Sequence, residues 1–315
     1  MTYRLVTRSD FDGLVCAALL EELDLIDDIL FVHPKDMQDG RVAITERDIT
    51  TNLPYVPGAH LVFDHHLSET VRVEERPANH IIDPTAPSAA RVVHRHYGGA
   101  DAFPRISDAL MEAVDKADSA RYDVDEILDP QGWTLLNFLM DARTGLGRFR
   151  DFRVSNYQLM MQLIDACREL AVDEILELPD VAERVALYRE QSAAFEQQLR
   201  RCARLDGDVV ILDLRDEEVI HAGNRFMIYA LFPQAKVSIH VLWGRQKQNT
   251  VLAVGKSIVD RSSRANIGEL MLRFGGGGHR NAGTCQVDHD HAEPALQAIV
   301  SAIHAAEYAT AAPSN

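Results

Sequence analysis

Carboxylate and imidazole side chains follow a short apolar run at residues 61–66, where the sequence is Leu-Val-Phe-Asp-His-His. Such a run predicts a buried strand, with Asp64, His65 and His66 leaving its carboxyl end. Open α/β sheets place their ligand sites at that edge. Oxygen and imidazole donors also suit Mn²⁺, Zn²⁺ and Fe²⁺. The motif alone fits either a metal site or an ordinary polar strand end, and other residues must decide between them.

Two pairs of aspartates could contribute to the same chemistry. Asp10 and Asp12 lie in an acidic turn ahead of a helix-like run. One Asp caps a helix well, so the second carboxylate favours a cation. Asp115 and Asp118 are three residues apart and share one helix face, which would be directed either to water or to a cation.

A glycine-rich segment near the C-terminus has a different character. Gly275–Gly278 are four consecutive glycines, followed by His279 and Arg280. A helix C-cap needs only one glycine, whereas successive glycine amides can form a concave anion site. Residues 256–280 contain five Lys or Arg and two acids, a local positive excess in a chain with net charge −16. We therefore favour phosphate binding over a flexible linker.

The elements around these motifs predict an α/β protein. Strands are expected at residues 3–7, 29–33 and 61–66, with a further strand at either 42–45 or 49–51, and helices follow several of them. Asp48 and Asn52 flank the later of these two alternatives, and either could point into the site. A long helix at residues 180–205 would then lead to a second set of strands, predicted at residues 209–212, 226–231 and 237–241.

We therefore expect three parts: residues 1–180 as a catalytic domain, 181–206 as a connecting helix, and 207–315 as a smaller α/β domain. The length of 315 residues permits two cores. No apolar run is long enough for a membrane span and no leader is recognisable, so we expect a cytoplasmic protein without a membrane partner. The acidic charge argues against binding duplex DNA. The four cysteines are scattered, which indicates reduced thiols.

Taken together, the motifs resemble the DHH phosphoesterase superfamily, in the branch that has a C-terminal DHHA1 domain. Residues 9–13 resemble the family's D-x-D-G turn, residues 64–66 its name-giving motif, and residues 275–279 its GGGH motif. Asp115 resembles the last metal-binding carboxylate. The resemblance spans nearly the whole chain and implies a parallel-sheet DHH domain joined by a long helix to the DHHA1 domain.

The resemblance also implies a function: hydrolysis of phosphoester bonds in short oligonucleotides or nucleotides, by in-line attack of a metal-activated water. Two cations are implied, Mn²⁺ first and Mg²⁺ or Co²⁺ as alternatives. The implied metal ligands are Asp10, Asp12, Asp48, Asn52, Asp64, His65 and Asp115. The implied catalytic residues are Asp12, Asp64, His65 and His66, with His66 and Asp118 orienting imidazole ligands. The implied substrate-binding residues are Ser257, Arg261, Gly276, Gly277, Gly278, His279 and Arg280.

Two departures from the family pattern leave alternatives open. Relatives carry an extra His or Asp just before the D-x-D pair, where this chain has Val6 and Arg8, and an Asp after the third strand, where Asn52 stands. The alternative functions are an inorganic polyphosphate or pyrophosphate hydrolase, and a nucleotide-binding regulatory module with weak or no catalysis. The expected partners are a short nucleic acid, nucleotide or polyphosphate, and a second copy of the chain in a homodimer.

Overall fold

The computed structural model describes residues 2–73, 75 and 77–308. The chain divides into two compact units. The first unit comprises Met1–Arg121 and Pro130–Tyr188, and the second comprises Tyr122–Asp129 and Arg189–Asn315. The predicted α/β class, with a parallel sheet in the N-terminal part, is confirmed. Within the described ranges, no helix is long and apolar enough to cross a membrane.

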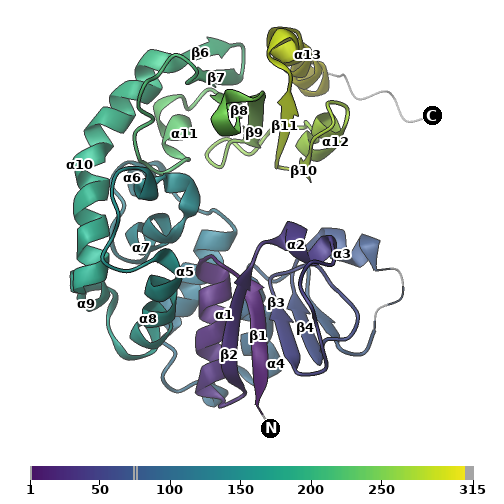
Figure 1. Cartoon of the computed structure of the whole chain (residues 1–315), viewed down its shortest axis with the longest axis vertical. Helices are drawn as coiled ribbons and strands as arrows, with labels where there is room; N and C mark the ends of the chain where they lie inside the picture. The colour runs from purple at the N-terminus through teal and green to yellow at the C-terminus, as the bar shows by residue number, and fades with distance from the viewer. Residues whose placement is uncertain (1, 74, 76, 309–315) are drawn as a thin grey trace. The chain divides into compact units, whose positions relative to one another are not determined.

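A parallel sheet in the order β2-β1-β3-β4-β5 forms the centre of the first unit (Figure 1). Its described strands are β1 (Tyr3–Arg8), β2 (Ile26–Val32), β3 (Asp48–Thr51), β4 (Leu61–Asp64) and β5 (His80–Ile82). The third strand thus takes the later of the two predicted positions. Residues 5–7 of β1 are fully buried, as expected when both faces of a parallel sheet are covered.

Helix α1 (Phe11–Glu22) is the central helix of the first unit, because its residues 11–20 are all buried. It lies beside β1 and β2 and packs against α4, α5 and α8 (Figure 1). The helices of this unit are α2 (Pro34–Gln38), α3 (Leu67–Arg72), α4 (Ala89–His96), α5 (Asp108–Asp118), α7 (Gly132–Met140), α8 (Asn156–Glu169) and α9 (Val172–Glu177), with short 3₁₀ turns at Gly99–Ala102, Ala142–Thr144 and Leu146–Arg148.

The second unit is built on a mixed sheet in the order β10-β11-β9-β8-β7-β6. Its strands are β6 (Ala203–Asp206), β7 (Val209–Asp213), β8 (Val237–Trp243), β9 (Thr250–Lys256), β10 (Gly277–His279) and β11 (Ala282–Val287). Its helices are α6 (Val124–Leu128), α11 (Met227–Leu231), α12 (Ile267–Leu272) and α13 (His289–Tyr308), with a 3₁₀ turn at Arg245–Lys247. Its core gathers apolar side chains of β7, β8, β9, α12 and α13.

One prediction about an element of the second unit is wrong. Residues 227–231 form helix α11 instead of part of a strand, because a short run that is apolar on every side does not distinguish the two structures. The predicted long helix is present as α10 (Pro179–Cys202), and its residues beyond Tyr188 belong to the second unit. Residues 122–129 also belong there: the Asn224 side chain donates a hydrogen bond to the Ile127 carbonyl.

Candidate metal centre

The carboxyl ends of β1, β3 and β4 in the first unit lie next to one another in the sheet. The parallel register aligns Thr7 of β1 with Thr51 of β3, and Thr51 with Phe63 of β4. The residues that follow these positions therefore emerge at the same edge. This edge holds the Asp10 turn, Asn52, and the Asp64-His65-His66 motif.

Asp12 is a buried carboxylate held by a helix N-terminus. Its two oxygens accept hydrogen bonds from the backbone amides of Ala89 at 2.9 Å and Ala90 at 2.8 Å, in the first turn of α4. Free amides and the helix dipole stabilise a negative charge at that position. Burial and, after it, the nearby charge of Asp118 nevertheless raise the pKa of Asp12 to about 7. A cation would offset both effects.

His65 is oriented as a metal ligand requires. Its Nδ1 lies 3.2 Å from the Ala86 carbonyl oxygen, which can only accept, so Nδ1 carries the proton. Its Nε2 is buried and lies 3.1 Å from an Asp118 oxygen, but without the alignment of a hydrogen bond. Burial lowers the pKa of His65, whereas Asp118 and Asp12 outweigh it and raise the pKa to about 9. The carboxylates that favour a proton on Nε2 would equally favour a cation beside it.

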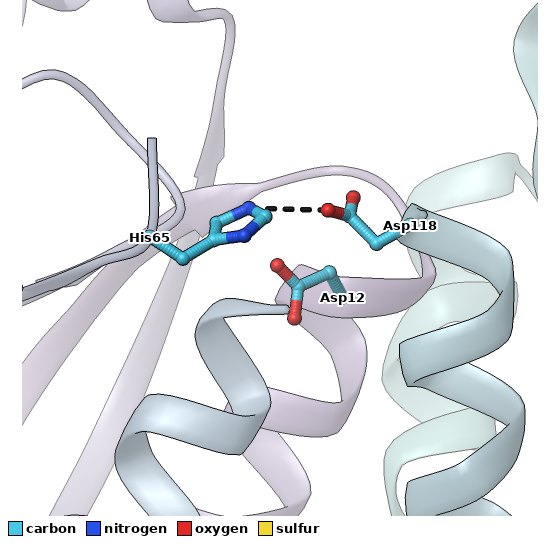
Figure 2. Close-up of side chains that lie close together, drawn as sticks. All are labelled: Asp12, His65 and Asp118. Carbon is cyan, nitrogen blue, oxygen red and sulfur yellow. Dashed lines mark ion pairs between the residues drawn. The ribbon is translucent and has the colours of Figure 1, made fainter. Parts of the chain in front are cut away.

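Asp12, His65 and Asp118 converge from three elements, namely the start of α1, the turn after β4 and the end of α5 (Figure 2). Each offers one ligand atom, and these atoms lie within 4.8 Å of one another. Two carboxylate oxygens and one imidazole nitrogen fit Mn²⁺, Zn²⁺ or Fe²⁺. We call Asp12, His65 and Asp118 the metal triad.

Asp64 shapes the turn that carries both imidazoles. It is fully buried, and its Oδ1 accepts hydrogen bonds from the backbone amides of His65 at 2.8 Å and His66 at 3.3 Å. The same oxygen lies 2.7 Å from His66 Nδ1. Burial lowers the pKa of His66, but the hydrogen bond to Asp64 outweighs it and the pKa is raised. The His66 side chain is 43% exposed, so its Nε2 is the ring nitrogen left for a ligand.

Asp10 and Asn52 form a second group at this edge. Asp10 caps α1 by accepting a hydrogen bond from the Gly13 amide at 3.0 Å, and it pairs with Arg8 at 2.9 Å. The Asn52 Nδ2 donates to Asp10 at 3.2 Å, from a backbone with φ of 54° that Asn tolerates better than most residues. Burial raises the pKa of Asp10, and the Arg8 charge opposes that rise.

The prediction that Asp115 faces the metal is wrong in this geometry, because its carboxylate is already paired. Ser88 Oγ donates to one oxygen at 2.7 Å, and Arg91 donates to the other through Nε and Nη2 at 2.8 and 2.6 Å. Asp118, one turn further along α5, is the residue that reaches His65. Asp115 instead fixes the first turn of α4, whose amides hold Asp12.

Asp48 is also excluded from this edge. It begins β3, so it lies at the amino end of a parallel strand, away from the residues that follow Thr51. Its carboxylate accepts hydrogen bonds from Arg4 at 2.7 Å and from the Thr45 amide at 2.6 Å. Of the two predicted alternatives, Asn52 is the one beside the Asp10 turn. Its Oδ1 is buried without a hydrogen-bond partner among the described residues.

In the second unit the glycine-rich segment forms an edge strand. Residues 277–279 make β10, which pairs with β11 and packs against α12. A Cβ on Gly276 or Gly278 would lie 2.2 or 2.3 Å from backbone oxygens of β11, whereas one on Gly277 would meet nothing within 4 Å. The glycines therefore allow close strand packing and leave backbone exposed at Gly277. The flexible-linker alternative does not hold.

The other predicted substrate residues differ in their accessibility. Ser257 is buried, and its hydroxyl accepts hydrogen bonds from the amides of residues 259 and 260, which makes it a turn residue. His279, Arg280 and Arg261 are exposed. Burial lowers the pKa of Lys256 and the Arg280 charge lowers it further, so these cations are neighbours.

Two charged groups beside Asp10 have no signal in the sequence. The Arg8–Asp10 pair is one of them, because in the sequence Arg8 is only a departure from the family pattern. Arg143, in the 3₁₀ turn at Ala142–Thr144, lowers the pKa of Asp10 by its charge, and no sequence signal pointed to it.

Comparison with known proteins identifies the family to which this chain belongs. No family model and no curated protein matches the chain. A solved structure described as the pGpG-specific phosphodiesterase PggH from Vibrio cholerae is 62% identical, covering 97% of this chain and 100% of that one, with a TM-score of 0.85. The chain belongs to the DHH phosphoesterase superfamily. The predictions of the family and of a phosphoester-hydrolysing enzyme are thereby confirmed.

Two more distant structures resemble this DHH phosphoesterase in fold alone. An exopolyphosphatase-related protein from Bacteroides fragilis is 14% identical, covering 96% of this chain and 92% of that one, with a TM-score of 0.54. CDC45 from Entamoeba histolytica is 9% identical, covering 96% and 95%, with a TM-score of 0.51. Identities this low support a shared fold and give no information about the substrate.

Proposed function

We propose that this DHH phosphoesterase hydrolyses the phosphodiester bond of short linear oligonucleotides, with pGpG as its first substrate, and that a divalent cation held by the metal triad supports the reaction. The observation that carries the proposal is the 62% identity, over the full length of that chain, with a pGpG-specific phosphodiesterase. The polyphosphate alternative has weaker support, since the exopolyphosphatase-related structure shares 14% identity.

The donor set supports a resident cation. Asp12 and Asp118 supply two negative charges, and His65 supplies a buried Nε2 without an aligned partner. Mn²⁺ is our first candidate, with Mg²⁺ and Co²⁺ as alternatives. When bound, such an ion would activate water and neutralise charge on the phosphoryl oxygens.

The residues of the chain would prepare that site. The Ala89 and Ala90 amides fix both oxygens of Asp12, and the Ala86 carbonyl fixes the tautomer of His65. Such partners orient a ligand before the ion arrives. Asp118 closes the triad from the end of α5. The site is thus assembled from elements whose positions are set by the packed sheet and helices.

For pGpG, the bond that breaks joins phosphorus to the 3′-oxygen of the first nucleoside. The oxygen of water joins the phosphate of the second nucleotide, the 3′-oxygen leaves with a proton, and two molecules of GMP result. His66 is our candidate donor of that proton through Nε2, because Asp64 holds its Nδ1 and raises its pKa.

In the second unit, the exposed β10 backbone, His279 and Arg280 are our candidates for binding a substrate phosphate.

A substrate panel tests the proposal. Metal-free protein is given Mn²⁺ and one of pGpG, 3′-phosphoadenosine phosphate, polyphosphate or pyrophosphate, and the products are separated by ion-exchange chromatography. We expect GMP from pGpG only when the ion is present, with Asp12→Asn as the inactive control. Phosphate release from polyphosphate without GMP from pGpG would overturn the proposal. Binding of pGpG without turnover would favour the regulatory alternative instead.

A further inference from the structure

We infer that the site of this chain takes a single divalent cation, at the metal triad, and that the Arg8 guanidinium occupies the place that a second cation would need beside Asp10. The inference rests on the proposed metal site and departs from the two-ion arrangement that the family resemblance implied.

Both carboxylate oxygens of Asp10 already have partners, two hydrogen-bond donors on one oxygen and the Arg8 ion pair on the other. The Gly13 amide and Asn52 Nδ2 donate to Oδ1, at 3.0 and 3.2 Å. Arg8 Nε lies 2.9 Å from Oδ2. An ion beside Asp10 would have to displace the guanidinium, which already supplies a positive charge at ion-pair distance.

Arg8 is fixed in place by the sheet. It is the last residue of β1 and pairs with Val32 of β2, so its backbone belongs to the central ladder of the first unit. Its side chain is 36% exposed, and that of Asp10 is 28% exposed. The sheet therefore fixes the Arg8 backbone close to Asp10, and the partly exposed guanidinium can also meet a ligand from solvent.

Asn52 is a neutral residue at the position where two ions would need an anionic ligand to bridge them. Two dications about 3.5–4 Å apart repel each other strongly and rely on bridging anions between them. Asn52 lies at this point as a neutral amide, with its Nδ2 directed to Asp10. Its buried Oδ1 could serve one ion, but it brings no negative charge.

For Asp10 and the metal triad, the charges balance with one ion. Arg8 neutralises Asp10, and a single dication neutralises the two carboxylates of the metal triad. A second dication beside Asp10 would place its charge next to the Arg8 guanidinium. Arg8 would then act on the substrate as a planar guanidinium, whose fork matches phosphate oxygens.

Manganese stoichiometry tests the inference. Metal-free full-length protein is titrated with Mn²⁺ by calorimetry, and the loaded protein is examined by electron paramagnetic resonance. We expect one ion per chain and the spectrum of an isolated Mn²⁺. Two ions with an exchange-coupled spectrum would overturn the inference and leave the proposed function intact. No bound ion would overturn the proposed function itself.

Variants locate the ion and the role of Arg8. Asp12→Asn should lose the ion, whereas Asp10→Asn should keep it; the reverse result would overturn the inference. Arg8→Ala combined with Asn52→Asp should bind a second Mn²⁺, and a stoichiometry that stays at one would contradict the role given to Arg8. Arg8→Gln with Asn52→Asp is the alternative if the first double variant does not fold.

The matched control is Arg4→Ala, which removes another Arg–Asp pair from the same strand, at the amino end of β3. It should keep one ion per chain. Circular dichroism and thermal melting of every variant separate loss of the ion from loss of the fold.

Discussion

At the residue scale, the site depends on which oxygen or nitrogen atoms lack an aligned hydrogen bond. His65 Nε2 is buried without an aligned hydrogen bond, whereas both oxygens of Asp115 are taken by Ser88 and Arg91. The sequence suggested Asp12 and His65 from motif and strand position. The family resemblance indicated Asp115 as the ligand instead of Asp118, because residues three apart share a helix face and only the packed partners distinguish them.

A pair of isosteric variants tests this distinction. Asp118→Asn removes a ligand of the metal triad, so we expect Mn²⁺ affinity and turnover to fall by more than about a hundredfold. Asp115→Asn loosens the first turn of α4 that holds Asp12, and such supporting changes cost roughly 10–100-fold in affinity. Calorimetry and turnover on pGpG measure both. If Asp115→Asn lost the ion and Asp118→Asn kept it, our assignment would be reversed.

At the element scale, the strands of the parallel sheet are held at both of their ends. The site lies at the carboxyl ends of the strands, which we call the carboxyl edge. The Arg4–Asp48 pair holds the amino ends, which we call the amino edge. Apolar runs that end in polar residues predicted β1 and β4 well. The choice of 49–51 over 42–45, like the helix at 227–231, depended on long-range burial that short apolar runs do not specify.

The amino-edge pair predicts a pH dependence of stability. Burial raises the pKa of Asp48, but its hydrogen bonds with Arg4 and Thr45 outweigh it and lower the pKa. Its stabilisation is therefore present above the unfolded pKa of about 3.9 and is lost as pH falls through the lower folded value. Asp48→Asn should cost about 1–3 kcal/mol of unfolding free energy near pH 7.

Urea denaturation across pH measures this difference. The gap between the wild type and Asp48→Asn should shrink as the pH drops below about 4. A gap that is independent of pH would show that the Asp48 charge is not what stabilises this edge.

The glycine-rich edge strand gives a second prediction at this scale. A Cβ at Gly278 would lie 2.3 Å from the Ala282 carbonyl oxygen, so Gly278→Ala should destabilise the second unit by about 1–3 kcal/mol. Gly277→Ala, with nothing within 4 Å, should stay within about 0.5 kcal/mol. Thermal melting compares the two. Equal destabilisation by both would contradict the close packing of β10 on β11.

At the scale of the whole molecule, each unit has its own sheet and core, and the described part of the chain realises the predicted α/β class twice. The sequence could not show that residues 122–129 belong to the second unit, because that depends on contacts with residues about a hundred positions away, such as the Asn224–Ile127 hydrogen bond. The metal triad, by contrast, belongs entirely to the first unit, so its geometry is set within one core.

The most direct measurement of the central claim is an anomalous diffraction map, recorded at the manganese absorption edge from crystals of the protein grown with Mn²⁺. We predict one peak, about 2.0–2.2 Å from a ligand atom of each of Asp12, His65 and Asp118, with Arg8 still paired to Asp10. Two peaks, or a single peak beside Asp10 with Arg8 displaced, would contradict a one-ion centre at the metal triad.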